Sequence, residues 1–294
     1  RKNVMISSQS PADAGPSLRV AGTMAYWQYH TYEQRGNRAA DYVVAESANV
    51  RDQLVRWYGL AEFRVPVIRN GVDHGLFYPR PQDRHAIRRS MDWPDDAVVA
   101  IAVGRLDRVK NHDYLVRALA MAVAQGDNLH AVIVGRGAQQ TRLQNLAGSL
   151  GVADRVHFPG HRDDVHLLLA AADIFVLPSL FESYGNAWPE AMATGLPCLG
   201  LRRSFGRIDT AADEHIDHEQ TGFLLGDDPA DGAGRLIELA RDLELRKRMG
   251  ALARTRALER YHWARTDREY LDLIRDVRLR RGLDVKQEAA ACST

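Results

Sequence analysis

The chain has 294 residues, 45% hydrophobic and 26% charged, which is a composition typical of globular proteins. Its formal net charge of +1 argues against nucleic acid as a partner, because no bulk positive field would attract it. The only two cysteines, Cys198 and Cys292, are far apart, which argues against a disulfide scaffold and favours a cytoplasmic protein.

The first part of the chain gives weak patterns. Residues 8–17 predict a loop, and residues 21–40 are compatible with a helix. A short buried strand is predicted at 41–47, a helix at 49–60, and a second strand at 65–73.

From residue 97 onward, strands and helices alternate. The strands are predicted at residues 97–106, 129–137, 155–160, 172–179, 197–201 and 221–226. The helices are predicted at residues 112–126, 141–152, 163–172, 187–195, 232–242, 244–261 and 264–280. The central strands are continuous apolar runs, as in parallel sheets that are buried on both faces. The alternation predicts an α/β fold with a doubly wound, mostly parallel sheet, which binds ligands beyond the carboxyl ends of its strands.

The loop after the strand at 97–106 carries two cations, Arg105 and Lys110, just before a helix. A helix N-terminus offers free N–H groups and partial positive charge, so two cations there suit a diphosphate. The loop alone does not separate this interpretation from a pair of solvated surface cations.

Three other loops give weaker signals. Residues 135–140 hold two glycines but lack the third glycine of a dinucleotide-binding fingerprint. His161 follows a strand, where a lone histidine is usually structural or solvated. His215 and His218 have helical spacing, but without a recognisable third ligand we predict no metal site.

Residues 181–195 read FESYGNAWPEAMATG and place two carboxylates, Glu182 and Glu190, on either side of a glycine turn. Gly185 lets the backbone approach a ligand, and Asn186 is placed to cap the next helix. Glu190 has a structural explanation, since it opposes the helix macrodipole. Glu182 has none, and a carboxylate there can accept hydrogen bonds from sugar or ribose hydroxyls. A carboxylate pair also suits glycoside hydrolysis, but the neighbouring cations favour an anionic leaving group.

Several motifs occur in order: GRLDRVKNHDYLVRAL, VIVGRG, RVHFPGHRDDV, DIFVLPSLFESYGNAWPEAMATGLPCL and TGFLL. With them the chain resembles the donor half of a retaining GT-B glycosyltransferase of family 4, over roughly residues 38–278. The resemblance implies a Rossmann-like donor-binding domain that transfers a sugar from a UDP- or GDP-sugar with retention of configuration. It also implies that neither a metal ion nor another cofactor is needed.

The resemblance further implies roles for single residues. Arg105 and Lys110 match the basic pair that binds the diphosphate and stabilises the leaving group, and Glu182 matches the acid near the donor sugar. These three are the candidate catalytic residues. The candidate donor-binding residues are Gly104, Arg162, Tyr184, Gly185, Asn186, Glu190 and Glu214. Among them Glu190 matches the acid that binds the ribose hydroxyls, and Arg162 lies where the base is held.

One departure from the family lies after the strand at 197–201. The glycine pair that usually precedes the acid at Glu214 is absent here. That loop normally helps to hold the donor sugar, so the identity of the sugar stays open. Arg202, Arg203 and Arg207 occupy the intervening loop and are candidates for contacting the sugar.

A second departure is the length available for the acceptor. A complete GT-B enzyme has an N-terminal Rossmann-like domain for it, whereas only the residues before Val72 are available here. We predict that residues 1–71 are a remnant of the N-terminal acceptor-side domain. We predict a nucleotide-sugar donor-binding domain at 72–257, and at 258–294 the C-terminal helix that returns to the first domain, with its tail.

The predicted activity is sugar transfer to a glycan, lipid or small-molecule acceptor. The alternative is a nucleotide-sugar-binding module that is inactive as written because its acceptor domain is truncated. The incomplete glycine fingerprint disfavours a dehydrogenase, and the ordered motifs disfavour a GT-B epimerase.

Four basic residues near the end of the chain allow two interpretations: Arg275, Arg278, Arg280 and Arg281. They suit a solvated helix face, which we favour, or peripheral contact with the inner face of a membrane.

Overall fold

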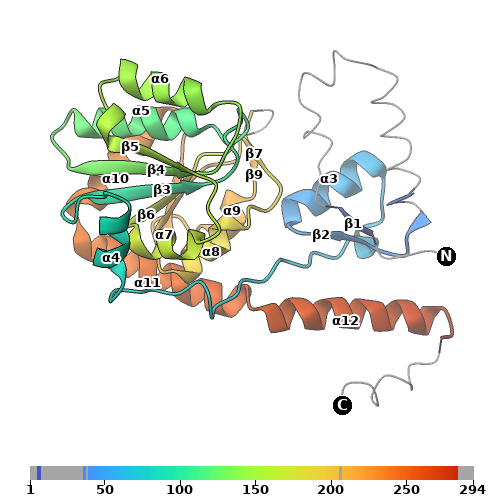
Figure 1. Cartoon of the computed structure of the whole chain (residues 1–294). Helices are drawn as coiled ribbons and strands as arrows, with labels where there is room; N and C mark the ends of the chain where they lie inside the picture. The colour runs from blue at the N-terminus through green and yellow to red at the C-terminus, as the bar shows by residue number, and fades with distance from the viewer. Residues whose placement is uncertain (1–4, 8–35, 38, 205–206, 284–294) are drawn as a thin grey trace. The chain divides into compact units, whose positions relative to one another are not determined.

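The computed structural model describes residues 5–7, 36–37, 39–204 and 207–283 (Figure 1). Its contacts divide the chain into two compact units. The smaller unit comprises Arg1–Gly71 with Tyr261–Thr294, and the larger unit comprises Val72–Arg260. The helix considered at residues 21–40, the C-terminal tail and Cys292 lie largely or wholly outside the described residues. The functions that we predict for the three regions of the chain stay predictions.

The larger unit is built on a six-stranded sheet in which all neighbours are parallel. Its strands are β3 (Val98–Val103), β4 (Leu129–Val134), β5 (Val156–Gly160), β6 (Ile174–Leu177), β8 (Cys198–Leu201) and β10 (Gly222–Leu225). They lie in the order β10-β8-β6-β3-β4-β5. The strands predicted from residue 97 onward are confirmed, and so is the α/β fold with a doubly wound parallel sheet.

The centre of the sheet is apolar on both faces. Every residue of β4 is buried, and so are the four central residues of β3. Two-sided burial explains why these strands read as continuous apolar runs and not as alternating patterns. Removal of this apolar surface from water drives the larger unit to fold around β3 and β4.

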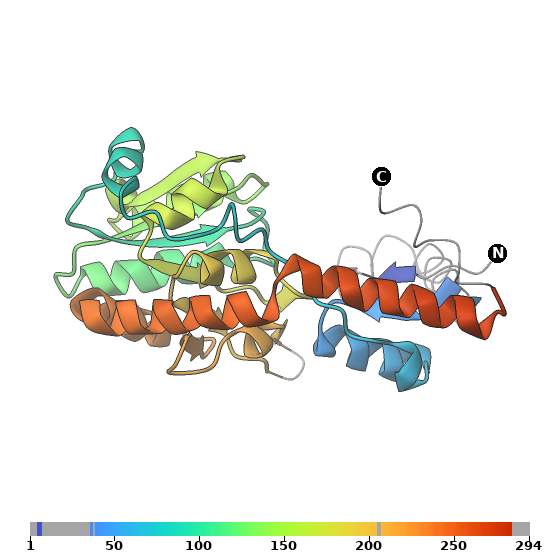
Figure 2. The same ribbon diagram turned by 90° about the horizontal axis from the view of Figure 1, so that it is seen from below.

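Helices pack on the two faces of this sheet. They are α4 (Arg84–Ser90), α5 (His112–Val123), α6 (Gln140–Ser149), α7 (Val165–Ala171), α8 (Ala187–Ala193), α9 (Ala212–His215), α10 (Pro229–Arg241) and α11 (Leu243–Arg260). α5 packs against both α6 and α10, with α5 and α6 side by side in Figure 1. α11 packs against α8, and Figure 2 shows its length along this unit. The sequence pattern predicted these helices, except for the short α4 and α9.

A buried ion pair explains the position of α4. Arg88 is fully buried, and its guanidinium donates to Asp173 Oδ2 at 2.6 Å and to the carbonyl oxygen of Ala171 at 3.0 Å. Asp173 Oδ2 also accepts from the backbone N–H of Val99 at 2.8 Å. The cluster therefore ties α4 to the end of α7 and to β3. Arginine is rarely buried, so a sequence pattern gives no reason to expect it here.

The smaller unit contains β1 (Met5–Ser7), which is parallel to β2 (Val43–Ala45), together with α3 (Ala48–Tyr58) and α12 (Trp263–Arg280). Ser47 caps α3 by accepting from the N–H of Val50 at 3.2 Å. On α12, the Thr266 hydroxyl donates to the carbonyl oxygen of Arg69 at 2.9 Å. Within the described part of the chain, no helix has both the length and the apolar character needed to cross a bilayer.

The predicted strand at 65–73 is wrong. This segment follows a short 3₁₀ turn at Glu62–Arg64 and forms only isolated bridges, one between Val67 and Ala45 and another at Val72. Pro66 lacks an N–H group and can only accept, which it does from the N–H of Ala45 at 3.0 Å. Val65, Ile68 and Val72 are buried here without a continuous ladder.

Candidate active site

The strand order of the larger unit places a switch point between β3 and β6. The chain moves from β3 outward to β4 and β5, and then returns to the other side of β3 with β6, β8 and β10. In open α/β sheets, ligands bind in the crevice outside the carboxyl ends of the two strands at such a point. The loops that flank it here are residues 104–111, after β3, and residues 178–186, after β6.

An ion pair connects these two loops. Lys110 Nζ contacts Glu182 Oε2, and the Ser179 hydroxyl donates to the same oxygen at 3.3 Å. The backbone joins the loops as well, because the N–H of Leu180 donates to the carbonyl oxygen of Val109 at 2.8 Å. Glu182 is only 9% exposed, so its charge depends on these two partners. The structure thus brings together two of the three predicted catalytic residues.

The β3–α5 loop holds its two cations differently. The Arg105 side chain is 80% exposed and lies 3.3 Å from Asp107, whereas Lys110 is partly buried. Asp107 Oδ1 also accepts from the N–H of Lys110 at 3.0 Å, which fixes the loop backbone. Arg105 is therefore free to move toward a ligand, while Lys110 is held in place.

His112, the first residue of α5, holds the backbone of this loop through a hydrogen bond. It is buried, and burial lowers its pKa from 6.5 to about 4. The neutral ring therefore donates from Nε2 to the carbonyl oxygen of Arg105, at 3.2 Å. Neither His112 nor Ser179 and Asp107 was singled out in the sequence, because their roles depend on contacts between loops.

Close packing of loops explains the glycines at 135 and 137. A Cβ on Gly135 would lie 1.9 Å from the carbonyl oxygen of Gly104, and one on Gly137 would lie 2.3 Å from that of Leu106. Gly104 itself lies against the aliphatic part of Lys110, where an added Cβ would be 3.5 Å away. The two glycines of residues 135–140 therefore serve the packing of two neighbouring loops.

The turn after β7 contains two of the predicted donor-binding residues, Gly185 and Asn186. β7 (Phe181–Glu182) pairs with β9 (Asp209–Thr210), a two-residue ladder that the sequence did not indicate. Gly185 has a φ of 80°, a left-handed conformation that favours glycine. Asn186 stands at the N-cap of α8, as predicted, but its side chain makes no capping hydrogen bond. Capping therefore explains less of this stretch than the sequence suggested.

Gly185→Ala is expected to destabilise the chain by about 1–2 kcal/mol, because alanine rarely adopts a left-handed conformation. Its Cβ would also lie 2.7 Å from Trp188 Cδ1 and 2.9 Å from Glu182 Cγ. Thermal and urea unfolding measure the change. The control is Gly148→Ala on α6, where the added Cβ meets nothing within 4 Å and no loss of stability is expected. Equal effects of the two substitutions would contradict the strained turn.

Tyr184 and Glu214 lie beside this turn but are held by the protein. The Tyr184 side chain is 2% exposed and packs edge-on against His215, at 4.8 Å between ring centroids. His215 Nε2 donates to the carbonyl oxygen of Tyr184 at 2.9 Å. Glu214 lies on α9, where its carbonyl oxygen accepts from Arg256 at 3.1 Å. The Tyr184 side chain therefore packs inside the protein, and the roles of Tyr184 and Glu214 in donor binding stay predictions.

Glu190 is the most unusual acid of the site. It lies in the first turn of α8, and burial raises its pKa from 4.5 to about 7. Within the described residues its carboxylate has no hydrogen-bond or ion-pair partner. A half-buried carboxylate without a partner costs stability, and such groups are typical of functional sites.

The remaining predicted residue, Arg162, follows β5. Its guanidinium donates to both carboxylate oxygens of Asp164, at 2.8 Å and 2.7 Å, which lowers the pKa of Asp164. The side chain lies at the edge of the same end of the sheet, two strands away from β3. Its part in holding a base stays a prediction.

The structure gives the histidines of the DEHIDHE run other partners than a metal. His215 is fully buried on Tyr184, and His218 Nδ1 accepts from the N–H of Leu224 at 3.0 Å. Over the described ranges, no three histidine, cysteine or acidic side chains come together in a way that would hold a metal ion.

Comparisons with known proteins agree with the ordered motifs. The family model described as "Glycosyl transferases group 1" matches residues 83–256, and the one described as "Glycosyltransferase Family 4" matches residues 18–76. The D-inositol 3-phosphate glycosyltransferase of Streptomyces scabiei is 36% identical over 239 residues, which are 77% of this chain and 52% of that protein. The protein of the same name from a Nocardioides species is 32% identical over 283 residues, which are 90% of this chain and 57% of that protein. The chain thus spans about half the length of these relatives.

Solved structures show the same fold. Anabaena Alr3699/HepE in complex with UDP-glucose has a TM-score of 0.81 at 22% identity, covering 94% of this chain and 72% of that chain. Sucrose-phosphate synthase from Thermosynechococcus elongatus has a TM-score of 0.76 at 24% identity, covering 92% of this chain and 67% of that chain. These likenesses confirm the GT-B type of fold. Because the group 1 family model matches more than half of the residues of this chain, the chain belongs to the group 1 glycosyltransferases.

Proposed function

We propose that this chain binds a nucleoside diphosphate sugar in the larger unit and serves the transfer of that sugar to an acceptor with retention of configuration. The observation that carries the proposal is the Lys110–Glu182 ion pair at the switch point between β3 and β6. It sets a cation for a phosphate group next to a carboxylate for sugar hydroxyls. UDP-glucose bound to Anabaena Alr3699/HepE, which has the same fold, supports this class of donor.

In the proposed reaction, an acceptor hydroxyl oxygen forms a bond to the sugar C1 while the bond between C1 and the diphosphate oxygen breaks. Negative charge grows on the diphosphate, and its departing oxygen takes the proton that the acceptor hydroxyl loses. Lys110 is already held at the site and would donate to this oxygen, while the exposed Arg105 would swing onto the diphosphate. Donors that are fixed before the reaction stabilise developing charge without reorganisation. These side-chain cations supply the charge that a metal ion would otherwise supply, so the proposal assigns no metal or other cofactor.

The two carboxylates would hold the neutral parts of the donor. Glu182 would accept from hydroxyls of the sugar, which it can do while it still contacts Lys110. Glu190 would accept from the two ribose hydroxyls, which are the partners that its carboxylate lacks. The turn at Gly185 and Asn186 would bring its backbone toward the phosphates, and Arg162 would lie near the base.

The loop after β8 stays the candidate for sugar selection. Arg203 lies 3.3 Å from Asp209, and Arg207 lies 2.7 Å from Asp227. Both arginines are therefore paired with acids, whereas Arg202 extends from the end of β8 and is exposed. Among the three, we propose Arg202 as the one that contacts the donor sugar.

Calorimetric titration of the chain with UDP-glucose and with GDP-mannose tests the proposal. We expect saturable binding of at least one of them, with one donor per chain. Release of UDP or GDP that depends on an added acceptor would support transfer by this chain. Binding without release would support the alternative of a donor-binding module. Absence of binding by every UDP- and GDP-sugar would contradict both.

The acceptor and the location belong to the same proposal. We propose a glycan, a lipid or a small molecule as acceptor and a cytoplasmic location, with no nucleic acid partner. Membrane contact through α12 has little support, because Arg275 lies 3.2 Å from Asp272 and Arg280 lies 2.8 Å from Asp276. Arginines that are paired along their own helix are typical of a solvated face.

A further inference from the structure

A polar cavity of about 460 Å³ lies where α5, α6 and α10 begin. Its lining includes Arg108 and Asn111 from the β3–α5 loop, Arg117 from α5 and Arg142 from α6. None of the residues that we assign to the donor belongs to this lining. The cavity borders the loop 104–111 that also serves the candidate active site, but it contains none of the residues assigned to the donor, so the proposed function does not explain it.

The charges of this cavity do not balance. In the described part of the chain, Arg108 and Arg117 form no hydrogen bond or ion pair. The two acids of the lining are already neutralised. Asp113 accepts from both ends of the Arg142 guanidinium, at 2.6 Å and 2.7 Å, and Asp227 lies 2.7 Å from Arg207. The guanidinium groups of Arg108 and Arg117 are therefore left without an acidic partner in the described residues.

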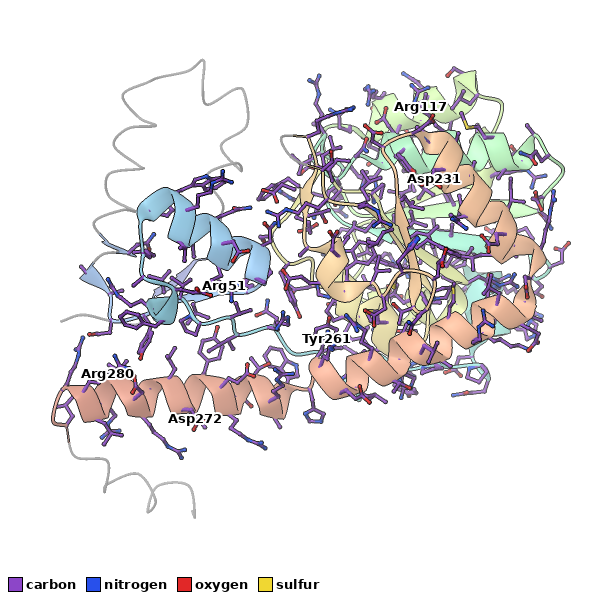
Figure 3. The ribbon with its side chains drawn as sticks, turned by 180° about the vertical axis from the view of Figure 1, so that it is seen from behind. Arg51, Arg117, Asp231, Tyr261, Asp272 and Arg280 are labelled. Carbon is purple, nitrogen blue, oxygen red and sulfur yellow. The ribbon has the colours of Figure 1, made fainter. Side chains whose placement is uncertain are left out.

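Two further carboxylates near the cavity are bound by backbone donors at the start of α10. Asp228 Oδ1 accepts from the N–H of Ala230 at 2.9 Å, and Asp231 Oδ2 accepts from that of Gly226 at 2.7 Å. Figure 3 labels Asp231, on α10, and Arg117, on α5. Each of these carboxylates accepts from an N–H group through one oxygen, and in the described residues neither forms an ion pair with Arg108 or Arg117.

The walls of the cavity are fixed by Tyr114. Its hydroxyl lies 3.0 Å from the carbonyl oxygens of Gly226 and Asp228, to which it can donate, and accepts from the N–H of Gly232 at 3.1 Å. Burial raises the pKa of Tyr114, so the hydroxyl keeps its proton. The start of α5 is thereby tied to the loop before α10, and the cavity does not depend on a ligand for its shape.

We propose that this cavity binds a phosphoryl group, either as inorganic phosphate or as part of a phosphomonoester. Two unpaired guanidinium forks match the oxygens and the double charge of a phosphate, whereas the fork of Arg142 is already occupied by Asp113. The amide of Asn111, which has no side-chain partner in the described residues, is a further donor. The volume exceeds that of a phosphate ion, which leaves room for the organic part of a phosphomonoester.

The test is an NMR titration of the isotope-labelled chain at constant ionic strength, with inorganic phosphate and separately with glycerol 3-phosphate. We expect saturable shifts of the backbone amides around Arg108, Arg117 and Arg142. Arg117→Gln should weaken this binding about tenfold or more, because one charge-assisted hydrogen bond is lost. Arg248→Gln, which changes an exposed arginine of α11, is the matched control and should leave the binding unchanged.

Lys110→Ala separates this cavity from the candidate active site. Shifts that persist in Lys110→Ala support the proposal, because the cavity does not contain Lys110. Shifts confined to residues 178–186, or lost in Lys110→Ala, would mean that phosphate occupies the donor site, and would overturn it. So would shifts that do not saturate, or equal weakening by Arg117→Gln and Arg248→Gln. A tighter fit of glycerol 3-phosphate than of phosphate would support it and identify the phosphomonoester as the source.

Discussion

Lys110→Ala is expected to lower the release of UDP or GDP from the donor about 100- to 1,000-fold, whether the sugar passes to an acceptor or to water. The ammonium of Lys110 is the cation that the protein holds in place at the switch point, and loss of one preorganised donor to a developing oxyanion has an effect of this size. The affinity for UDP or GDP should fall about tenfold or more, since a charge-assisted hydrogen bond is lost. Chromatography of the released nucleotide and calorimetry measure the two effects.

A change in folding has to be separated from this loss. Without Lys110, the buried carboxylate of Glu182 keeps only the hydroxyl of Ser179, so the single variant is expected to unfold at a lower temperature. The double variant Lys110→Ala/Glu182→Gln removes the unpaired charge. It should recover the stability without recovering the rate.

The matched control is Lys247→Ala, which breaks another Lys–Glu pair. Lys247 lies 3.0 Å from Glu244 on the surface of α11, with side chains 62% and 81% exposed. Such exposed pairs contribute little, so neither the stability nor the release of nucleotide should change measurably. A Lys110→Ala variant that releases nucleotide as fast as Lys247→Ala would show that the ion pair is structural and that the catalytic assignment is wrong.

The sequence predicted the sheet well because burial of β3 and β4 leaves a direct trace, a run of apolar residues in each strand. It also placed Lys110 and Glu182 at the carboxyl ends of strands. It did not predict that they touch, because 72 residues separate them and only the position of β6 beside β3 brings them together. Residues that support them through contacts between loops, such as Ser179 and His112, were missed for the same reason.

Errors arose where tertiary contacts override local patterns. The segment 65–73 is apolar enough for a strand, yet it forms only isolated bridges, at Val67 and Val72, and Pro66 has no N–H group to donate to a ladder. α4 was missed because it is short and because its position depends on the buried Arg88. The two-residue strands β7 and β9 are too short to show a period. Burial of the Tyr184 side chain against His215 also depends on a tertiary contact, and its assignment to the donor stays a prediction.

Glu190→Gln is expected to stabilise the ligand-free chain at neutral and alkaline pH by about 1–3 kcal/mol, on the scale of 1.36 kcal/mol per pKa unit. Below pH 4.5 the carboxyl is neutral in the folded and unfolded states, so its ionisation costs nothing. As the pH rises toward 7, the unfolded chain loses this proton while the folded chain keeps it, because burial raises the pKa of Glu190 to about 7. Stability therefore falls between these pH values, and above pH 7 the full cost remains.

Urea unfolding at pH 4.5 and at pH 8 measures this dependence. The advantage of Glu190→Gln over the unsubstituted chain should be large at pH 8 and nearly absent at pH 4.5. Glu259→Gln is the control, because Glu259 is an exposed acid on α11 and its replacement should have the same small effect at both pH values. An advantage that is independent of pH would show that Glu190 is not the group whose ionisation is suppressed by burial.

The same variant distinguishes a structural from a binding role for Glu190. If the carboxylate only opposed the dipole of α8, its removal would destabilise the chain and leave donor affinity unchanged. If it holds the ribose, Glu190→Gln should weaken the binding of a nucleotide sugar about tenfold or more, while the chain becomes more stable. A ligand with ribose hydroxyls supplies the hydrogen-bond donors that the protein does not give to this carboxylate. The free-energy cost of burying the carboxylate is therefore recovered only when the donor binds.

Calorimetry with the ribose and 2′-deoxyribose forms of the same nucleotide tests this role directly. The deoxy form should bind the unsubstituted chain more weakly than the ribose form does. The two forms should bind Glu190→Gln with equal affinity.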